Sequence, residues 1–226
     1  MKKLILLCAV ALSFFTSCET ENSEDVTQNR IFTSYEILYL QDEDKTVAKA
    51  TFTFGNASGT RLELSEGASV TFNDKKIPFN SLLGNYELEM SGLVESGTFT
   101  YTDIEGNTFT NEFAIKPIAF VENVPTTIER SKSYDIDWIG DPVGSGESSV
   151  VVTVVPNNLG QTKIFIEADE NAETVVLNPT VLSEIDPQPG RLYIERKDVS
   201  TEMESTSAGG VFYGNYRATS VPITIE

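Results

Sequence analysis

Apolar and polar side chains alternate with a period of two along most of the chain after residue 30. In segment 47–54 one set of alternate positions is Ala48, Ala50, Phe52 and Phe54, and the other is Lys49, Thr51 and Thr53. Successive side chains of a β-strand point to opposite faces, so this pattern predicts a strand with one face in a core. After residue 29 no segment has the apolar spacing of an amphipathic helix. The pattern therefore predicts an all-β chain.

Turn-forming sequences recur about every 8 to 12 residues between the predicted strands, which is typical of antiparallel β-sandwiches. The chain has 226 residues, enough for two domains. We predict two tandem sandwich domains, residues 30–117 and 118–226, packed end to end with a short link. The β-branched run 148–155 predicts a strand that is buried on both faces or lies at the domain junction. The polar segment 198–210 predicts a mobile loop.

The charge and the rare residue types exclude several classes of function. Asp and Glu total 34 and Lys and Arg total 16, which gives a net charge of −18. Because phosphates attract clustered basic residues, this charge argues against nucleic acid as a partner. The chain has no histidine, and its two cysteines are Cys8 and Cys18. This composition excludes Ser-His-Asp and Cys-His catalysis and most zinc sites, so we predict no enzyme and no resident cofactor.

The N-terminus has the layout of a secretory signal. Lys2 and Lys3 precede an apolar run from Leu4 to Phe15, which is too short to span a bilayer as a helix. The segment Phe15-Thr16-Ser17-Cys18 resembles the lipobox of bacterial lipoproteins, with Phe15 where leucine is usual. The resemblance implies that residues 1–17 are a signal peptide and that Cys18 becomes the first residue and carries acyl chains such as palmitate. Several acyl chains on one residue anchor a protein stably.

Four acidic residues follow this cysteine closely: Glu19, Glu21, Glu24 and Asp25. The cluster resembles the export signal that places Bacteroidota lipoproteins on the outer face of the outer membrane, and it therefore implies exposure at the cell surface. The alternative is a solvated acidic tether, residues 18–29, on a protein that faces the periplasm. Both readings place the membrane at the N-terminus.

The predicted strand spacing, the tandem arrangement and the absence of disulfides after Cys18 resemble the immunoglobulin-like modules of Bacteroidota surface lipoproteins. This resemblance covers residues 30–226 and concerns architecture, and a fold does not fix a function. It implies a non-catalytic binding or adhesion protein with a glycan or protein ligand. The alternative is a structural or accessory subunit of an outer-membrane assembly, which binds its partner through sheet edges or an apolar patch.

Aromatic residues are the first candidates for a ligand site. In the stretch Gly209–Tyr216, glycines allow a close backbone approach, and Tyr213 and Tyr216 are candidates to line a site at the loop end. Their alternative role is to pack on the sandwich beside a hairpin turn. Trp138 is the single tryptophan. It is a candidate sugar platform, although its alternation with Tyr134 and Ile136 favours a place in the core.

Acidic residues are the second candidates. Asp135 and Asp137 share one face of a predicted strand, and Asp141 follows in the next loop. Carboxylate oxygens suit calcium, so these three residues form a candidate calcium site. The spacing of a known calcium loop is absent, and a solvated strand face is the alternative.

Overall fold

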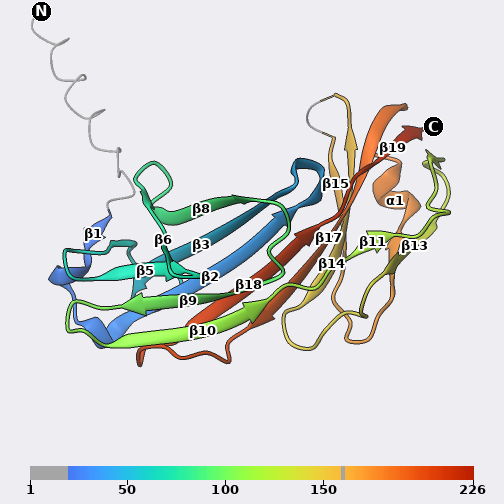
Figure 1. Cartoon of the computed structure of the whole chain (residues 1–226). Helices are drawn as coiled ribbons and strands as arrows, with labels where there is room; N and C mark the ends of the chain where they lie inside the picture. The colour runs from blue at the N-terminus through green and yellow to red at the C-terminus, as the bar shows by residue number, and fades with distance from the viewer. Residues whose placement is uncertain (1–19, 159–160) are drawn as a thin grey trace, which may run out of the picture.

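The computed structural model describes residues 20–158 and 161–226, and this part of the chain consists mainly of strands (Figure 1). Its one α-helix is the single turn α1 (Pro179–Leu182), which Asn178 caps by accepting the Val181 N–H at 3.0 Å. The prediction of an all-β chain built from sandwiches is confirmed. Within the same residues, no helix has the length and apolar content needed to cross a bilayer.

A ten-stranded sheet runs through both halves of the molecule. Its strands are β2 (Ile31–Leu40), β3 (Lys45–Phe54), β7 (Phe79–Asn80), β8 (Asn85–Ser91), β12 (Thr127–Ile128), β14 (Ser149–Pro156), β15 (Lys163–Glu167), β17 (Gln188–Ser200), β18 (Gly210–Arg217) and β19 (Val221–Ile225). The spatial order is β12-β19-β17-β18-β2-β3-β8-β7, and β14 joins β17 and β15.

β17 is the strand at which this sheet divides. One edge of β17 pairs with β14 over residues 190–197. The other edge pairs with β19 over residues 188–192 and with β18 over residues 195–200. Two partial sheets therefore share one long strand, and Figure 1 shows β17 and β18 crossing between the two ends of the molecule.

The shared sheet crosses the predicted domain boundary at residue 117. β18 lies in predicted domain 118–226, but it pairs in parallel with β2 of predicted domain 30–117 along its full length. Of the segment predicted as a loop, 198–210, residues 201–209 do connect two strands, whereas residues 198–200 belong to the end of β17 and Gly210 to the start of β18. The two sandwiches are consequently joined by backbone hydrogen bonds as well as by the connecting chain.

The first sandwich forms where a smaller sheet covers the inner face of β2, β3 and β18. This sheet contains β10 (Thr108–Ala114), β9 (Ser96–Thr102), β5 (Ser69–Phe72) and β6 (Lys75–Lys76). Its core is aromatic: the Tyr35 and Phe99 rings stack at 4.6 Å between centroids, and Phe113 stacks on Phe212 at 3.9 Å. Because Phe212 belongs to β18, the far end of the chain helps to complete this core.

The second sandwich packs β11 (Ala119–Phe120), β13 (Tyr134–Ile139), β16 (Thr174–Leu177) and α1 against β14, β17 and β19. Its buried side chains are mostly β-branched or leucine: Ile136, Val150, Val152, Val154, Val175, Leu177, Leu192 and Ile194. The run 148–155 lies at the junction, as one of its predicted alternatives states, because β14 lies between β15 and the dividing strand β17. Alternate residues of β14 are buried and half-buried, so only one face is fully covered.

The described part of the predicted tether is docked on the first sandwich. β1 (Glu21–Asn22) pairs in parallel with β4 (Leu62–Glu63), and two 3₁₀ turns follow, η1 (Ser23–Asp25) and η2 (Gln28–Arg30). Ser23 and Gln28 are buried, and the Gln28 amide donates to the Ser23 carbonyl at 2.6 Å. Buried polar groups that find partners fix the segment in place. From Thr20 onward the chain is thus part of the folded body; Cys18 and Glu19 lie outside the described residues.

The connection from β17 to β18, residues 201–209, is held at both sides. Glu204 exchanges hydrogen bonds with the Asn111 side chain on β10, at 2.6 and 2.9 Å. The Thr206 hydroxyl donates to the Ile31 carbonyl at 2.7 Å, and the Ser207 hydroxyl donates to Asn29 at 2.6 Å. These contacts attach the predicted mobile loop to the first sandwich.

Candidate functional site

Tyr213 and Tyr216, the candidate pair, lie on opposite faces of β18. They are three positions apart in a continuous strand, and only positions two apart share a face. Tyr216 is 6% exposed, and its ring lies 5.0 Å from the Tyr39 ring in the core. Tyr213 lies on the outer face, with the Lys197 ammonium 5.0 Å from its ring centroid. The two tyrosines therefore do not meet at a loop end, because residues 210–216 belong to the strand β18.

Trp138 is a buried junction residue. Its indole N–H donates to the Asp141 carbonyl at 2.9 Å, and the ring packs in the core, as its alternation predicts. A buried ring with its N–H paired offers no open face for a sugar.

The three candidate calcium ligands are not brought together. Asp135 and Asp137 are exposed on β13, and Asp137 accepts the Thr174 hydroxyl at 2.6 Å. Asp141 instead pairs with Lys116 at 3.2 Å. Within residues 20–158 and 161–226 no three His, Cys, Asp or Glu side chains are grouped as a metal site requires. In the described residues, Asp135, Asp137 and Asp141 therefore do not form the cluster of carboxylates that the candidate calcium site requires.

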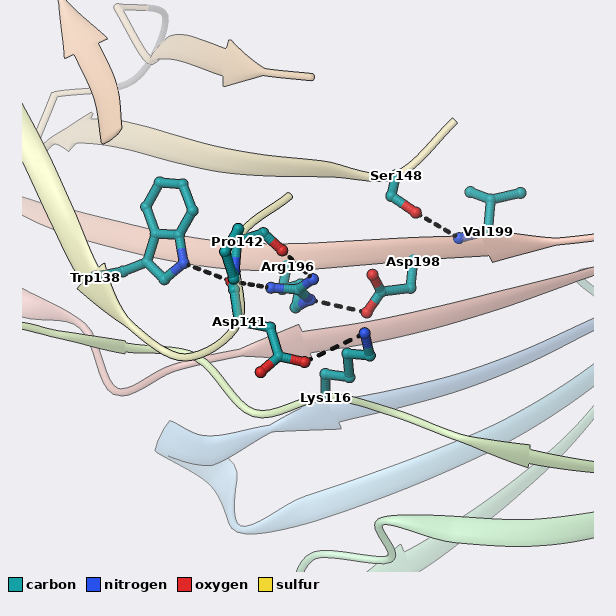
Figure 2. Close-up of polar contacts among 8 residues, drawn as sticks. All are labelled: Lys116, Trp138, Asp141, Pro142, Ser148, Arg196, Asp198 and Val199. Carbon is teal, nitrogen blue, oxygen red and sulfur yellow. Dashed lines mark hydrogen bonds and ion pairs between the residues drawn. The ribbon is translucent and has the colours of Figure 1, made fainter. Parts of the chain in front are cut away.

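A buried cation organises the junction instead (Figure 2). Arg196 on β17 is 1% exposed, and its Nε donates to the Asp198 carboxylate at 2.9 Å. Its other nitrogens donate to the carbonyls of Asp141, at 2.6 Å, and Pro142, at 2.8 Å. Buried charges are tolerated when they are paired and hydrogen-bonded; Arg196 has a carboxylate partner, and each of its three side-chain nitrogens donates one hydrogen bond.

This network joins three separate segments. Figure 2 shows the loop after β13, the β17 strand and the Lys116 segment meeting around Arg196. Lys116 is the next-to-last residue of the predicted first domain, 30–117, so the Lys116–Asp141 ion pair connects that boundary to the second sandwich. All the contacts of the Arg196 guanidinium are internal, and this geometry makes it a structural clamp.

A concave surface lies on the outer face of the large sheet. It encloses about 520 Å³ over a floor of Val151, Thr153, Val155, Ile164 and Tyr193, with a rim of Leu40, Gln41, Asp42, Glu43, Glu195 and Arg217. We call this surface the outer groove. Ligand sites are usually concave and apolar with a few placed polar groups, so the outer groove is the candidate functional site.

Strand register explains why these floor residues meet. Thr153 on β14 pairs with Tyr193 on one side and with Ile164 on the other. Residues paired across neighbouring strands point to the same face, so the three side chains form one row. The next row contains Val151 and Glu195, and Glu195 leads on to Arg217 of β18.

The rim is held by the turn η3 (Gln41–Glu43). The Asp42 carboxylate accepts the Ser220 hydroxyl at 2.5 Å, and Arg191 donates to the same hydroxyl at 2.6 Å. Gln41 accepts the Thr219 N–H at 3.0 Å. The β2–β3 turn of the first sandwich is thereby fixed to the β18–β19 connection, and the outer groove has a rigid wall.

The charged rim groups form ion pairs. Arg217 pairs with Glu195 at 2.7 Å, and Glu43 pairs with Lys45 at 3.1 Å. The rim carries three carboxylates and one guanidinium, so its charge favours cationic ligand groups. Sequence reasoning missed this site because its members come from β14, β15, β17, β18 and the β2–β3 turn. One sequence pattern could have indicated the site. In β15, Ile164 and Ile166 flank Phe165, so both faces of this strand carry apolar residues.

No protein-family model matches this sequence, and no curated protein matches it. Among solved structures, a similar chain is that of the crystal structure of chicken CNTN1 FN1–FN3 domains, with 8% sequence identity and a TM-score of 0.28. The similarity covers 85% of this chain and 66% of that chain, so this chain spans slightly less than two thirds of it. A likeness at this level carries no argument about the outer groove.

Proposed function

We propose that this protein is a lipid-anchored, non-catalytic binding protein whose ligand occupies the outer groove. The observation that carries the proposal is an apolar depression of about 520 Å³ with a charged rim, built on rigid strands. Sites on strands hold their geometry better than sites on loops. The lack of histidine and the pairing of the rim charges support a binding role over catalysis.

The chemistry of the floor favours a protein segment over a glycan. Val151, Val155 and Ile164 are aliphatic, and Tyr193 is the one aromatic side chain that lines the groove. Sugars pack on flat aromatic faces, whereas aliphatic side chains of a partner protein fill aliphatic depressions. An apolar segment that carries basic residues fits both the floor and the rim.

Substitutions in the outer groove test this proposal. The chain from Cys18 is immobilised and probed with a polysaccharide array and with envelope proteins of the producing cells. We expect the parent chain to capture one ligand in a stoichiometric complex. Ile164→Asp and Tyr193→Ala should abolish this complex, because each removes apolar surface from the floor of the outer groove. Ile139→Asp is the control, since Ile139 is 59% exposed on β13 and does not line the groove. Binding that survives both groove substitutions contradicts the proposal, and polysaccharide binding lost with them identifies a glycan ligand.

The proposed location is the outer membrane, facing the cell exterior, with Cys18 as the lipid-bearing residue. The lipobox resemblance and the acidic residues after Cys18 support it, and a periplasm-facing position is the alternative. Protease treatment of intact cells distinguishes the two, because only a surface protein is then lost. Cys18→Ala is the matched variant, and we expect it to leave the membrane fraction. A Cys18→Ala chain that remains membrane-bound contradicts the anchor.

A second candidate function is that of an accessory subunit of an outer-membrane assembly. The observation that favours it is β15, which pairs only with β14 among the described strands and exposes Ile164 and Ile166. Edge strands with exposed apolar residues are surfaces to which a partner strand adds. Co-purification of one stoichiometric membrane protein, lost on Ile166→Lys, supports this role; a monomer after crosslinking in intact cells contradicts it.

A further inference from the structure

The most exposed large apolar side chain of the described residues is Leu82, at 91%, and Leu83 beside it is 48% exposed. Both lie in the turn between β7 and β8, residues 81–84. From Asn80 to Asn85 this segment has no charged residue. An exposed pair of leucines in a neutral turn marks an interaction surface, because water solvates it poorly.

Hydrogen bonds within the turn fix its conformation, in which both leucines are exposed. The Asn80 side-chain oxygen accepts the N–H groups of Leu82, at 3.1 Å, and Leu83, at 3.2 Å. The Asn80 carbonyl accepts the Gly84 N–H at 2.8 Å, and Gly84 has a φ of 63° that favours glycine. Arg61 donates to the Leu83 carbonyl. The turn is therefore preorganised, and the leucines are not a frayed end.

The position of the turn identifies its partner. A Cβ placed on Gly84 would lie 3.6 Å from the Thr20 hydroxyl oxygen, so the start of the described chain touches this turn. Thr20 is two residues after Cys18, and two Cα–Cα steps span at most about 7.6 Å. In Figure 1 the turn before β8 projects on the side where the described chain begins. A lipid on Cys18 therefore brings the bilayer to within reach of Leu82.

We propose that the Leu82–Leu83 turn inserts into the membrane interface as a second contact beside the lipid anchor. This inference rests on the proposed anchor at Cys18. Apolar side chains at the level of the lipid headgroups bury their surface in the acyl boundary. Arg61, the cation that touches the turn, suits the phosphates of lipid headgroups. Two contacts fix the orientation of the body on the membrane, which a lipid on a free tether does not.

The test supplies the anchor chemically, so that it does not depend on lipidation in the cell. Cys18 is the one cysteine of the chain from residue 18, and its thiol couples to a maleimide lipid in phosphatidylethanolamine–phosphatidylglycerol vesicles. Leu82→Trp reports the environment of the turn, and Ile139→Trp is the control at an exposed position of the second sandwich. The native Trp138 is buried and common to both variants.

We expect brominated lipids to quench the indole introduced at position 82 and aqueous iodide to quench it several-fold less than the indole at position 139. Equal iodide quenching at both positions, with no effect of brominated lipids, overturns the inference. Unchanged thermal midpoints verify that both variants are folded. The anchor itself is judged separately, by whether Cys18→Ala leaves the membrane fraction of cells. Failure of the inference and failure of the anchor are thus distinguished.

Discussion

At the scale of single residues, Arg196 is a charged side chain whose hydrogen bonds stabilise the fold. It is the buried cation of the junction, and it binds one carboxylate of its own strand and two carbonyls of the loop after β13. Nothing in the sequence around it marks this role, since the alternation of β17 predicts only that position 196 faces inward. Its partners at 141 and 142 lie in the loop after β13, and no local pattern connects them with it.

We expect Arg196→Met to destabilise the protein by about 3–5 kcal/mol, because it leaves Asp198 and two carbonyls without their donor. Urea unfolding followed by circular dichroism measures this loss. Arg217→Met is the control: the side chains of its ion pair with Glu195 are 46% and 26% exposed, so solvent screens the pair and about 1 kcal/mol or less is expected. Equal losses for the two variants contradict the clamp.

Tyr101 carries a second residue-scale prediction. Its ring is fully buried, and its hydroxyl has no hydrogen-bond partner. Burial, reinforced by the charge of Asp103, raises the pKa of the Tyr101 hydroxyl well above its usual value of 10.0. Above pH 10 the folded state retains a proton on Tyr101 that the unfolded chain loses. The stability that Tyr101 contributes in its neutral form is therefore complete below pH 10 and declines as the pH rises above it.

We therefore expect Tyr101→Phe to cost little or to stabilise at pH 7, by up to about 1 kcal/mol, since it removes an unpaired buried polar group. Above pH 10 the variant loses stability less steeply than the parent chain. Urea midpoints measured from pH 7 to pH 11 test both parts. A variant with the same alkaline slope as the parent shows that the Tyr101 hydroxyl does not contribute to it.

At the scale of elements, β18 decides the architecture. Its last residue, Arg217, lines the outer groove, and its inward residues Phe212 and Tyr216 enter the core. Phe212 stacks on Phe113 with an interplanar angle of 2°. The sequence predicts a loop end or a hairpin turn in this glycine-containing stretch, because glycines allow a close backbone approach. Gly210 is tolerated because its neighbours Met203 and Thr33 already fill the space where a Cβ would lie.

Phe212→Ala tests this element. We expect a loss of about 3–5 kcal/mol, as for any large aromatic residue of the core, although Phe212 lies far from the first sandwich in sequence. Tyr213→Ala, on the opposite face of β18, should cost much less. Chemical denaturation of both variants measures the difference. Comparable losses contradict the assignment of Phe212 to the first core.

At the scale of the whole molecule, the shared strand β17 predicts one cooperative unit. Trp138 lies in the second sandwich and reports its unfolding by fluorescence, whereas far-ultraviolet circular dichroism reports all strands. Because β17 belongs to both sandwiches and pairs with β18 of the first, we expect the two signals to change with one midpoint in urea. Two separated transitions would show instead that the sandwiches unfold independently. By the same argument, a chain that ends at residue 117 lacks β18 and should not fold.

The alternation of side chains determined the all-β class by itself, and it placed Ala48, Ala50 and Phe52 in the core, where they lie buried. This succeeded because the face to which a strand residue points is a local property of the backbone. Pairing is not local. Contacts between distant segments decided three features: β18 pairs with β2, Tyr213 and Tyr216 lie on opposite faces, and the outer groove forms. Such contacts depend on complementary surfaces that become neighbours only when the whole sheet assembles, and a single sequence does not record them locally.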